Sequence, residues 1–428
     1  MTGGGDYQER GSIAFEFPQS ESYNRGVVET DFPVKKMEEK MKKSSGRFLL
    51  FVFIGLLVFN VSAETEKALK DVVIPFELAD YVILVKCRIN DAQEFYNFIL
   101  DTGGLTVIDK TLADELKLKQ LGPQAKINTL YLGEFAVEKV FVFTNFDLQP
   151  LRSSYGIDVR GIIGSDILED YIVTIDYEKQ QLVLSMDMES LAFEKQSNKA
   201  GYFLKFTKHP INHAPMITCR LNGNIEVEAM IDTGQPYPLV LPLKELARTG
   251  AIKQKSTLKA KGVVVKWPGT ISPDNFLARL KCFEADRLKI DNIITVFAEL
   301  PALLSVPLLG GDFLSRYLIK IDYLHEEILL DPKTGFQGLD HSFSTGLHLE
   351  ENGENHLLVR GIWEKSPADR AKIQVGDLIL EFNSKKVTPK LHKDLWLLLN
   401  DDKIKAVELL IGTKEGPRKI LLKKEILI

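Results

Sequence analysis

The sequence NFILDTGGLTVID, from Asn97 to Asp109, places an acidic residue at the end of a run typical of a β-strand. Asp101 ends the apolar run and is followed by Thr102 and Gly103, which favour a turn. Acidic residues are common in turns at strand ends, so this motif alone indicates a turn as readily as a functional site. Whether Asp101 has a chemical role depends on the rest of the sequence.

A second copy of the motif lies at Asp232. VKCRIN, which begins at Val85, precedes the first Asp-Thr-Gly tripeptide, and ITCRLN, which begins at Ile217, precedes the second. The parts that follow also match, because GIIGSDILEDYIVTIDY from Gly161 corresponds to PLLGGDFLSRYLIKIDY from Pro307. Two matched segments in the same order predict a duplicated domain.

Both copies have the pattern of β structure, with short runs rich in Val, Ile, Phe and Tyr between polar or glycine-bearing turns. We expect a mainly β protein with a first lobe over residues 72–196 and a second over residues 201–335. Short helical patterns follow each Asp-Thr-Gly and each apolar-apolar-Gly segment. Four further repeated acids are interpreted as structural: Asp166 and Asp312 as helix caps, Asp176 and Asp322 as strand-end residues.

Together these motifs resemble the aspartic proteases, in the form of two retropepsin-like lobes fused in one chain as in the pepsins. The resemblance covers residues 72–335 and implies two β-barrel lobes, each contributing one catalytic aspartate from a turn that an apolar-apolar-Gly segment supports. The residues that it implies are the catalytic Asp101 and Asp232, the supporting Thr102, Gly103, Thr233 and Gly234, and the segments Ile162-Ile163-Gly164 and Leu308-Leu309-Gly310.

Paired carboxylates explain why a strand ends on an acid. Two carboxyl groups held close together cannot both ionise at low cost, so they share one proton and titrate as a unit. One aspartate then acts as the base on a water molecule while its protonated partner donates to the carbonyl oxygen of a peptide bond, an arrangement that the aspartic proteases exemplify. We therefore expect an aspartic endopeptidase that acts on a peptide or protein substrate.

The sequence departs from the family pattern directly after each tripeptide. The family usually has a small Ala, Ser or Thr there, whereas this chain has Gly104 and Gln235. We expect the Gln235 amide to donate to the Asp232 carboxylate or to obstruct the site, which leaves open a second function, a catalytically inactive peptide-binding envelope protein with the protease fold. The sequence shows no clear glycine-tipped hairpin to cover the substrate, because the segment from Leu118 to Leu130, where the family has one, is short.

A third unit is expected over residues 342–428. The stretch HLLVRGIWEKSPADRAKIQVGDLILEF resembles the PDZ domains of bacterial envelope proteases, in which a strand leads to Ser-Pro-Ala, a short helix and a Gly-Asp turn. The resemblance implies an α/β domain that takes an extended peptide as an extra strand. A packing module is the alternative. The implied peptide-binding residues are Gly346, Leu347, His348 and Leu349.

The N-terminal region predicts export from the cytoplasm. RFLLFVFIGLLVFNVSA, from Arg47 to Ala63, has a short apolar run after basic residues and a small-residue cleavage pattern, as in a signal peptide. The polar residues before Met41 are predicted to be disordered, and translation is expected to begin at Met41. Residues 1–63 are therefore a disordered extension with a signal peptide, or alternatively a membrane anchor. The expected location is periplasmic or secreted, or else membrane-anchored with the domains outside the cytoplasm.

Composition limits the remaining possibilities. A net charge of −5 gives no basic surface for a phosphate backbone, so no nucleic acid partner is expected. Cys87, Cys219 and Cys282 have no ligand-like spacing, and Pro210 disfavours the helix that would align His209 with His213. We therefore expect no metal and no cofactor, and a monomeric chain.

Overall fold

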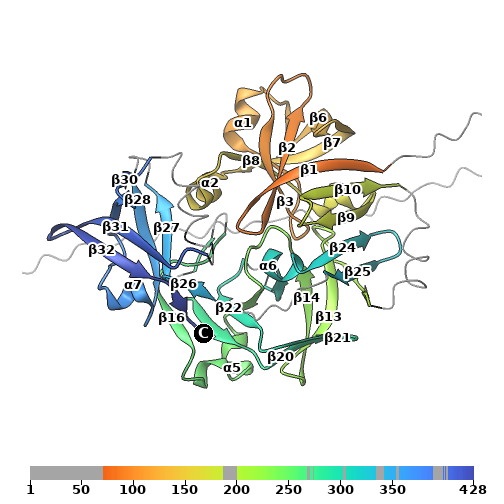
Figure 1. The fold of residues 1–428 in the computed structure, drawn as a ribbon. Coiled ribbons are helices and arrows are strands. Elements are labelled where there is room, and N and C mark those ends of the chain that lie inside the picture. Colours follow the sequence, from red (N-terminus) through yellow and green to blue (C-terminus); the bar gives the residue numbers. More distant parts are fainter. Residues whose placement is uncertain are drawn as a thin grey trace, which may run out of the picture. The chain divides into compact units, whose positions relative to one another are not determined.

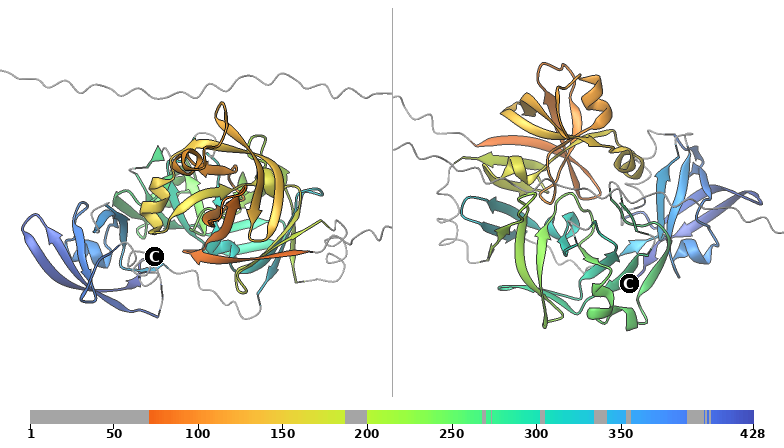
Figure 2. Two further views of the ribbon diagram at one scale, coloured as in Figure 1. Left: turned by 90° about the horizontal axis from the view of Figure 1, so that it is seen from above. Right: turned by 180° about the vertical axis from the view of Figure 1, so that it is seen from behind.

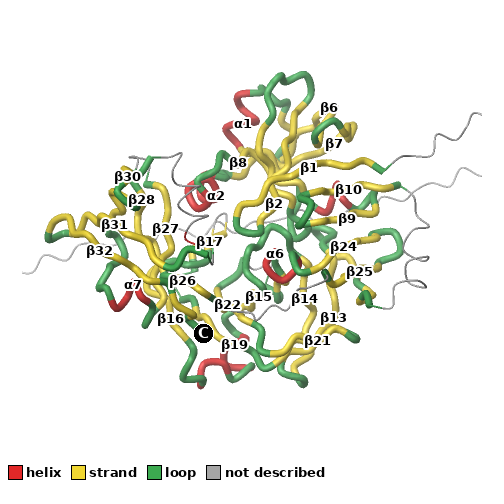
Figure 3. The backbone as a smooth tube through the Cα atoms, viewed as in Figure 1, coloured by secondary structure: helices red, strands yellow, loops and turns green. Residues whose placement is uncertain are grey.

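The computed structural model describes residues 71–186, 200–267, 270–272, 274–301, 305–333, 342–352, 356–388, 399, 401 and 403–428. The fold is mainly β, as predicted (Figure 1, Figure 3). Residues Lys67–Ile428 form one compact unit. The predicted disordered extension, signal peptide and anchor in residues 1–63 lie outside the described residues. No helix among the residues that the structure describes is long and apolar enough to cross a membrane.

The first repeat, residues 72–196, contains a closed barrel. Its six strands follow the order β2, β3, β8, β4, β7 and β6, and pairing between β6 and β2 closes the ring. The elements of this repeat are β1 Val72–Ala79, β2 Val82–Ile89, β3 Tyr96–Leu100, β4 Val107–Asp109, α1 Lys110–Glu115, β5 Gln120–Leu121, β6 Gln124–Leu132, β7 Phe135–Phe146, α2 Gln149–Tyr155, β8 Val159–Ile163, α3 Ser165–Leu168, β9 Ile172–Asp176 and β10 Gln181–Ser185.

The second repeat, residues 201–335, uses the same local pairings around its own Asp-Thr-Gly turn. A strand before the turn runs parallel to the strand of the apolar-apolar-Gly segment in both repeats. Its elements are β11 Tyr202–Lys205, β12 Thr207–Lys208, β13 Pro215–Leu221, β14 Ile225–Ile231, β15 Leu239–Pro242, α5 Glu245–Arg248, the 3₁₀ helix η2 Ala251–Lys253, β16 Leu258–Gly262, β17 Lys266–Trp267, β18 Thr270–Ile271, β19 Phe276–Arg279, β20 Cys282–Ala285, β21 Leu288–Asp291, β22 Ile294–Ala298, β23 Leu308–Leu309, α6 Gly311–Leu314, β24 Tyr317–Asp322 and β25 Glu327–Pro332.

The repeated Ile-Asp-Tyr strands join the two repeats. β9 pairs antiparallel with β24, so that Thr174 lies opposite Lys320. The resulting run of strands, β1, β10, β9, β24, β25 and β11, takes three strands from each repeat (Figure 1). Alternate residues of β9 and β24 are fully buried, including Ile175 and Ile319, and they belong to one hydrophobic core that spans both repeats. Burial of these aliphatic side chains, each worth about 1.5–3 kcal/mol, holds the repeats together.

The C-terminal segment, residues 342–428, has its own core but also shares a sheet with the second repeat. β16 pairs antiparallel with β28, so the green strands of the second repeat adjoin the blue strands of the C-terminal segment (Figure 2). Ala260 lies opposite Trp363 in this pairing, and Trp363 packs in the core of the second repeat. An ion pair of 2.6 Å joins Lys261 to Asp369 across the same boundary. The elements of this segment are β26 Phe343–Ser344, β27 Leu347–Glu351, β28 Leu357–Trp363, α7 Pro367–Arg370, β29 Leu378–Phe382, β30 Lys385–Lys386, β31 Ala406–Thr413, β32 Gly416–Lys423 and β33 Glu425–Ile426.

The predicted helix caps are wrong, although the predicted helices exist. α3 and α6 begin after Gly164 and Gly310, and neither glycine has a side chain to cap with. Asp166 instead accepts hydrogen bonds from the N–H and hydroxyl of Thr106, both at 2.8 Å. Asp312 pairs with Arg316 at 3.1 Å. Asp166 therefore ties α3 to the turn before β4, whereas Asp312 bonds within its own turn of chain.

Candidate active site

The pairing of the strands brings the two aspartates together. β3 runs parallel to β8, and the Asp101 N–H donates to the Ile163 carbonyl at 2.9 Å. β14 runs parallel to β23 in the same manner, and the Asp232 N–H donates to the Leu309 carbonyl at 2.9 Å. The side chains of Asp101 and Asp232 then lie within hydrogen-bond reach of each other.

Two threonines lock the turns to each other. The Thr102 hydroxyl donates to the Ile231 carbonyl at 2.7 Å and accepts from the Thr233 N–H at 3.1 Å. The Thr233 hydroxyl donates to the Leu100 carbonyl at 2.7 Å and accepts from the Thr102 N–H at 3.0 Å. Both threonines are fully buried, so these four bonds have no competition from water.

The glycines of the two turns make room for the carboxylates. A Cβ on Gly103 would lie 2.7 Å from the Asp232 carboxyl carbon, and one on Gly234 would lie 2.4 Å from that of Asp101. Neither distance is possible for a real side chain. Each glycine also donates its N–H to the aspartate of its own turn, at 2.8 Å for Gly103 and 3.0 Å for Gly234. Glycine is therefore required where one turn approaches the acid of the other.

The surroundings of the two acids favour one shared proton. Burial raises the pKa of Asp101 despite hydrogen bonds from Asp232 and from the backbone of Gly103. Burial, followed by the charge of Asp101, raises the pKa of Asp232 well above its ordinary value. The first ionisation leaves a negative charge that opposes the second, so the pair holds a proton to a higher pH than an isolated aspartate does.

The pair opens into a cavity of about 400 Å³. Asp101 and Asp232 line it together with residues of both repeats and of the C-terminal segment. Its walls include Asp80, Gly103, Gly104, Ser154, Tyr155, Asn212, Gln235, Tyr237, Val264, Val265, Leu347, His348, Leu349 and Arg360. A space of this size suits a few residues of an extended peptide.

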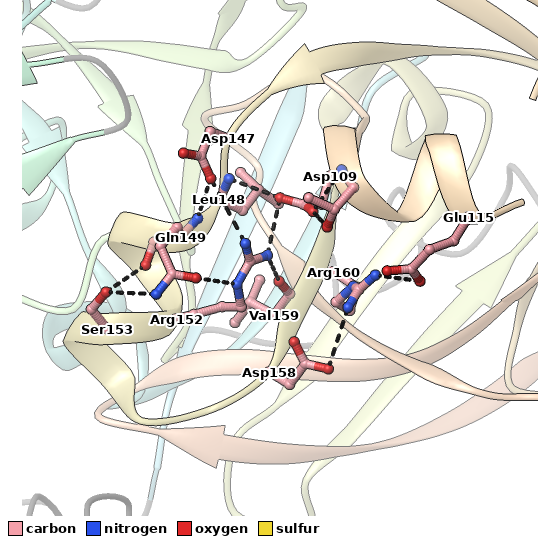
Figure 4. Close-up of polar contacts among 11 residues, drawn as sticks. Asp109, Glu115, Asp147, Leu148, Gln149, Arg152, Ser153, Asp158, Val159 and Arg160 are labelled. Carbon is pink, nitrogen blue, oxygen red and sulfur yellow. Dashed lines mark hydrogen bonds and ion pairs between the residues drawn. The ribbon is translucent and has the colours of Figure 1, made fainter. Parts of the chain in front are cut away.

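Helix α2, which the sequence analysis did not predict, forms one wall of the cavity through Leu151, Ser154 and Tyr155. A fully buried acid anchors it: Asp109 pairs with Arg152 at 3.0 Å and accepts from the Leu148 N–H at 2.9 Å (Figure 4). Burial acts to raise the pKa of Asp109, but these bonds and one from Thr111 together hold that pKa below its ordinary value. Pro150 near the start of the helix and Gly156 at its end were the available signals.

Other polar residues of the cavity were also missed from sequence. Asp80, at the turn between β1 and β2, has a pKa raised well above its ordinary value by burial and by Asp312. The amide of Asn212 donates to the Gly103 carbonyl at 2.6 Å and so supports the first turn. Neither residue lies in a repeated motif, which left no pattern to single them out.

Gln235 does not behave as expected. Its side-chain oxygen accepts from the Tyr237 N–H at 3.0 Å, and its buried amide nitrogen has no hydrogen-bond partner. The expected donation from this amide to Asp232 is therefore wrong; the backbone of Gln235 interacts with that carboxylate instead. At Gly104, a Cβ would lie 2.6 Å from an oxygen of Asp101, so the missing side chain leaves space for the acid.

Residues 118–130 contain a hairpin in which β5 pairs antiparallel with β6 and Gly122 lies in the turn. These residues form β5 and part of β6, and none of them lines the cavity. Val264 and Val265, which lead into the β17–β18 hairpin, line it instead, and β17 contacts α2. The second repeat thus contributes to this wall of the cavity through Val264 and Val265.

Of the four residues predicted to bind peptide, three line the cavity: Leu347, His348 and Leu349. Gly346 does not; a Cβ there would lie 2.2 Å from Ser366, and its φ of 81° favours glycine. Burial, then the charge of Arg360, lowers the pKa of His348 to about 3, so its ring is neutral at physiological pH. The predicted peptide site and the aspartates therefore share one cavity.

Each repeat has a buried tyrosine at the end of its Ile-Asp-Tyr motif, but only one of the two hydroxyls has a hydrogen-bond partner. Tyr323 donates to Ser165 at 2.8 Å, because the Ser165 hydroxyl itself donates to the Thr102 carbonyl at 2.7 Å. The corresponding hydroxyl of Tyr177 is buried without a partner. Gly311 stands where the first repeat has Ser165, and a Cβ there would lie 2.5 Å from the Tyr81 carbonyl oxygen. Tyr81, in the hairpin between β1 and β2, thus occupies the space that the side chain of a serine at position 311 would need.

Other candidate ligand residues are dispersed. The three cysteines are buried and unpaired with one another. His213 contacts Glu169 at 2.6 Å. No group of three or more His, Cys, Asp or Glu side chains that could hold a metal occurs within the described ranges.

Comparison with known proteins assigns no family. No protein-family model matches the chain, and no curated protein matches it. Among solved structures, the chain is similar to basic 7S globulin from soybean, with a TM-score of 0.34 and 9% sequence identity over 61% of this chain and 95% of that chain. A likeness of this size assigns neither a family nor a function.

Proposed function

We propose that the chain is an aspartic-type endopeptidase with two protease-like lobes, over residues 72–196 and 201–335, and a C-terminal PDZ-like domain over residues 342–428. Asp101 and Asp232 are the catalytic pair in this proposal. The observation that supports it most is their contact across two turns that reciprocal threonine bonds lock together. Both pKa values are raised, which favours one shared proton.

In the proposed reaction, the ionised aspartate takes a proton from water while the water oxygen bonds to the carbonyl carbon of the peptide. The protonated aspartate gives its proton to the carbonyl oxygen. The resulting diol collapses as one of its hydroxyls returns a proton to the ionised aspartate, the carbon–nitrogen bond breaks, and the nitrogen leaves with the proton of the other aspartate. Thr102, Gly103, Thr233 and Gly234 act by holding the carboxyl groups in place.

The alternative is a catalytically inactive peptide-binding protein with the same fold. Obstruction by Gln235 was its basis, whereas the Gln235 side-chain oxygen accepts a hydrogen bond from the Tyr237 N–H. The peptidase is therefore the better supported of the two. A periplasmic or secreted location belongs to the proposal as well and rests on residues 47–63, so sequencing the N-terminus of the exported protein tests it.

A cleavage assay on reduced, unfolded protein between pH 3 and pH 8, with and without pepstatin, tests the activity. The proposal predicts hydrolysis with an acidic optimum that pepstatin inhibits, because the shared proton is lost as pH rises. Absence of cleavage at every pH, with binding of unfolded chains retained, supports the inactive alternative.

A further inference from the structure

An unpaired arginine faces the same cavity as the aspartates. Nε and Nη1 of Arg360 are buried and have no hydrogen-bond partner. Among the described residues, no carboxylate forms an ion pair with it. Removing these two nitrogens of a charged group from water without an anionic partner is costly. A ligand that supplies this anion would resolve the imbalance.

A β-bulge sets the direction of the Arg360 side chain. On β27, Leu349 pairs with Val359 and His348 pairs with Gly361, so that Arg360 on β28 has no opposite residue. Its carbonyl accepts from the Val263 N–H at 2.8 Å, which joins the bulge to the second repeat. Bulges commonly redirect a side chain at functional sites. Here the extra residue is the one that lines the cavity.

The backbone around Arg360 suits an extended peptide. Among the described strands, β27 pairs only with β28, so one edge of β27 has free backbone groups. Leu347 and Leu349 of this strand line the cavity that contains the aspartates, and α2 contacts the strand. An extended chain added along this edge meets Arg360 and the aspartates in one continuous space.

The charges around Arg360 favour a carboxylate. Arg360, Tyr155 and Tyr237 line the same cavity, and the charge of Arg360 acts to lower the pKa of both tyrosines. Burial is the larger effect and raises both tyrosine pKa values, so the phenols are neutral and cannot balance the arginine. Asp80 also has a raised pKa and is not paired with Arg360. The positive charge is thus left for a ligand.

We propose that Arg360 determines specificity by binding a carboxylate of the peptide in this cavity, either the C-terminal carboxylate or an acidic side chain. The proposal rests on the proposed peptidase function, but binding can be measured without cleavage. The planar guanidinium accommodates a carboxylate better than an ammonium group does, because two of its N–H groups can donate in parallel.

The experiment measures binding in an Asp101→Asn background, which removes the catalytic pair but retains the cavity. Three random decapeptide libraries serve as probes: one with free C-termini, one with amidated C-termini, and one amidated library made without Asp and Glu. Peptides retained at pH 7 are quantified by mass spectrometry. Arg360→Gln is compared with Arg360→Lys and with Arg418→Gln. Arg418 is a matched control, since its Nε is also buried without a partner but it does not line the cavity.

We expect Arg360→Gln to weaken retention of carboxylate-bearing peptides at least tenfold, Arg360→Lys to do so partly, and Arg418→Gln to have no effect. Loss confined to the free-C-terminus library identifies the C-terminal carboxylate, and loss from the amidated library that contains Asp and Glu identifies an acidic side chain. The proposal is overturned if the library that lacks carboxylates is retained as well as the libraries that contain them. It is also overturned if Arg360→Gln retains carboxylate-bearing peptides as well as the protein that keeps Arg360. Without peptide, Arg360→Gln should be at least as resistant to urea as the protein that keeps Arg360. If Arg360 had a structural role instead, the same substitution would lower the resistance to urea. If the wild-type protein, which retains Asp101, bound these peptides without hydrolysing them, the proposed peptidase function would be contradicted. The proposed role of Arg360 would still hold.

Discussion

Thr102 and Thr233 each accept a hydrogen bond from the backbone N–H of the other, at distances of 3.1 and 3.0 Å. This exchange joins two turns that lie more than a hundred residues apart in the chain, and each hydroxyl also donates to a backbone carbonyl of the opposite repeat. The position of each aspartate is therefore fixed by the other repeat.

Replacing Thr102 with Val should destabilise the protein by about 2–4 kcal/mol, because it leaves the Thr233 N–H and the Ile231 carbonyl buried without partners. Thr102→Ser keeps the hydroxyl and serves as the control. Urea unfolding followed by fluorescence measures the difference. A Val variant as stable as the Ser variant would contradict the role given to this hydroxyl.

The sequence predicted the strand that ends at Asp101, its repeat at Asp232 and the strands from Ile172 and Tyr317, because each lies in a local pattern that occurs twice. It did not predict that Arg360 enters the same cavity. That position depends on pairing between β16 and β28, which no local pattern encodes. The direction of the Gln235 side chain likewise depends on Tyr237 and on packing.

The two buried tyrosines of the Ile-Asp-Tyr motifs should respond unequally to loss of the hydroxyl. Tyr323→Phe removes a buried hydrogen bond to Ser165 and should cost about 1 kcal/mol in the free energy of unfolding. Tyr177→Phe removes a hydroxyl that has no partner and should be neutral or slightly stabilising. Chemical denaturation of both variants provides the comparison, each serving as the other's control. Equal losses would argue against the asymmetry.

Asp232→Asn should raise stability at pH 7, because it removes a buried carboxyl group whose ionisation is unfavourable in the folded state. The folded pKa of Asp232 is higher than its ordinary value of 3.8, so the folded state holds the proton more tightly. The stabilising contribution of protonated Asp232 is fully present below the ordinary pKa of 3.8 and is lost as pH rises through the folded pKa. Urea unfolding at pH 7 and pH 3 tests this, and the gain should vanish at pH 3. A gain of the same size at both pH values would be inconsistent with titration of this group.

Arg152→Ala should destabilise the protein by about 2–4 kcal/mol, since it leaves the fully buried Asp109 without its cation. Arg160→Ala is a matched control: both arginine side chains are 16% exposed, but Arg160 pairs with Glu115 and Asp158, which are 58% and 64% exposed. The control should lose less than about 1 kcal/mol. Hydrogen exchange of α2 residues should accelerate only in Arg152→Ala. Equal effects in the two variants would show that Asp109 does not depend on its partner.

The most direct test of the proposed function is the rate of hydrolysis by Asp101→Asn and Asp232→Asn at the wild-type optimum pH. Each variant keeps the shape of its side chain but removes one member of the pair, so the account predicts that both lose hydrolysis while remaining folded. Asp176→Asn, at a strand end where the side chain accepts from the Glu178 N–H, should keep full activity. Turnover close to wild type in either Asp101→Asn or Asp232→Asn would contradict a mechanism that needs both carboxyl groups.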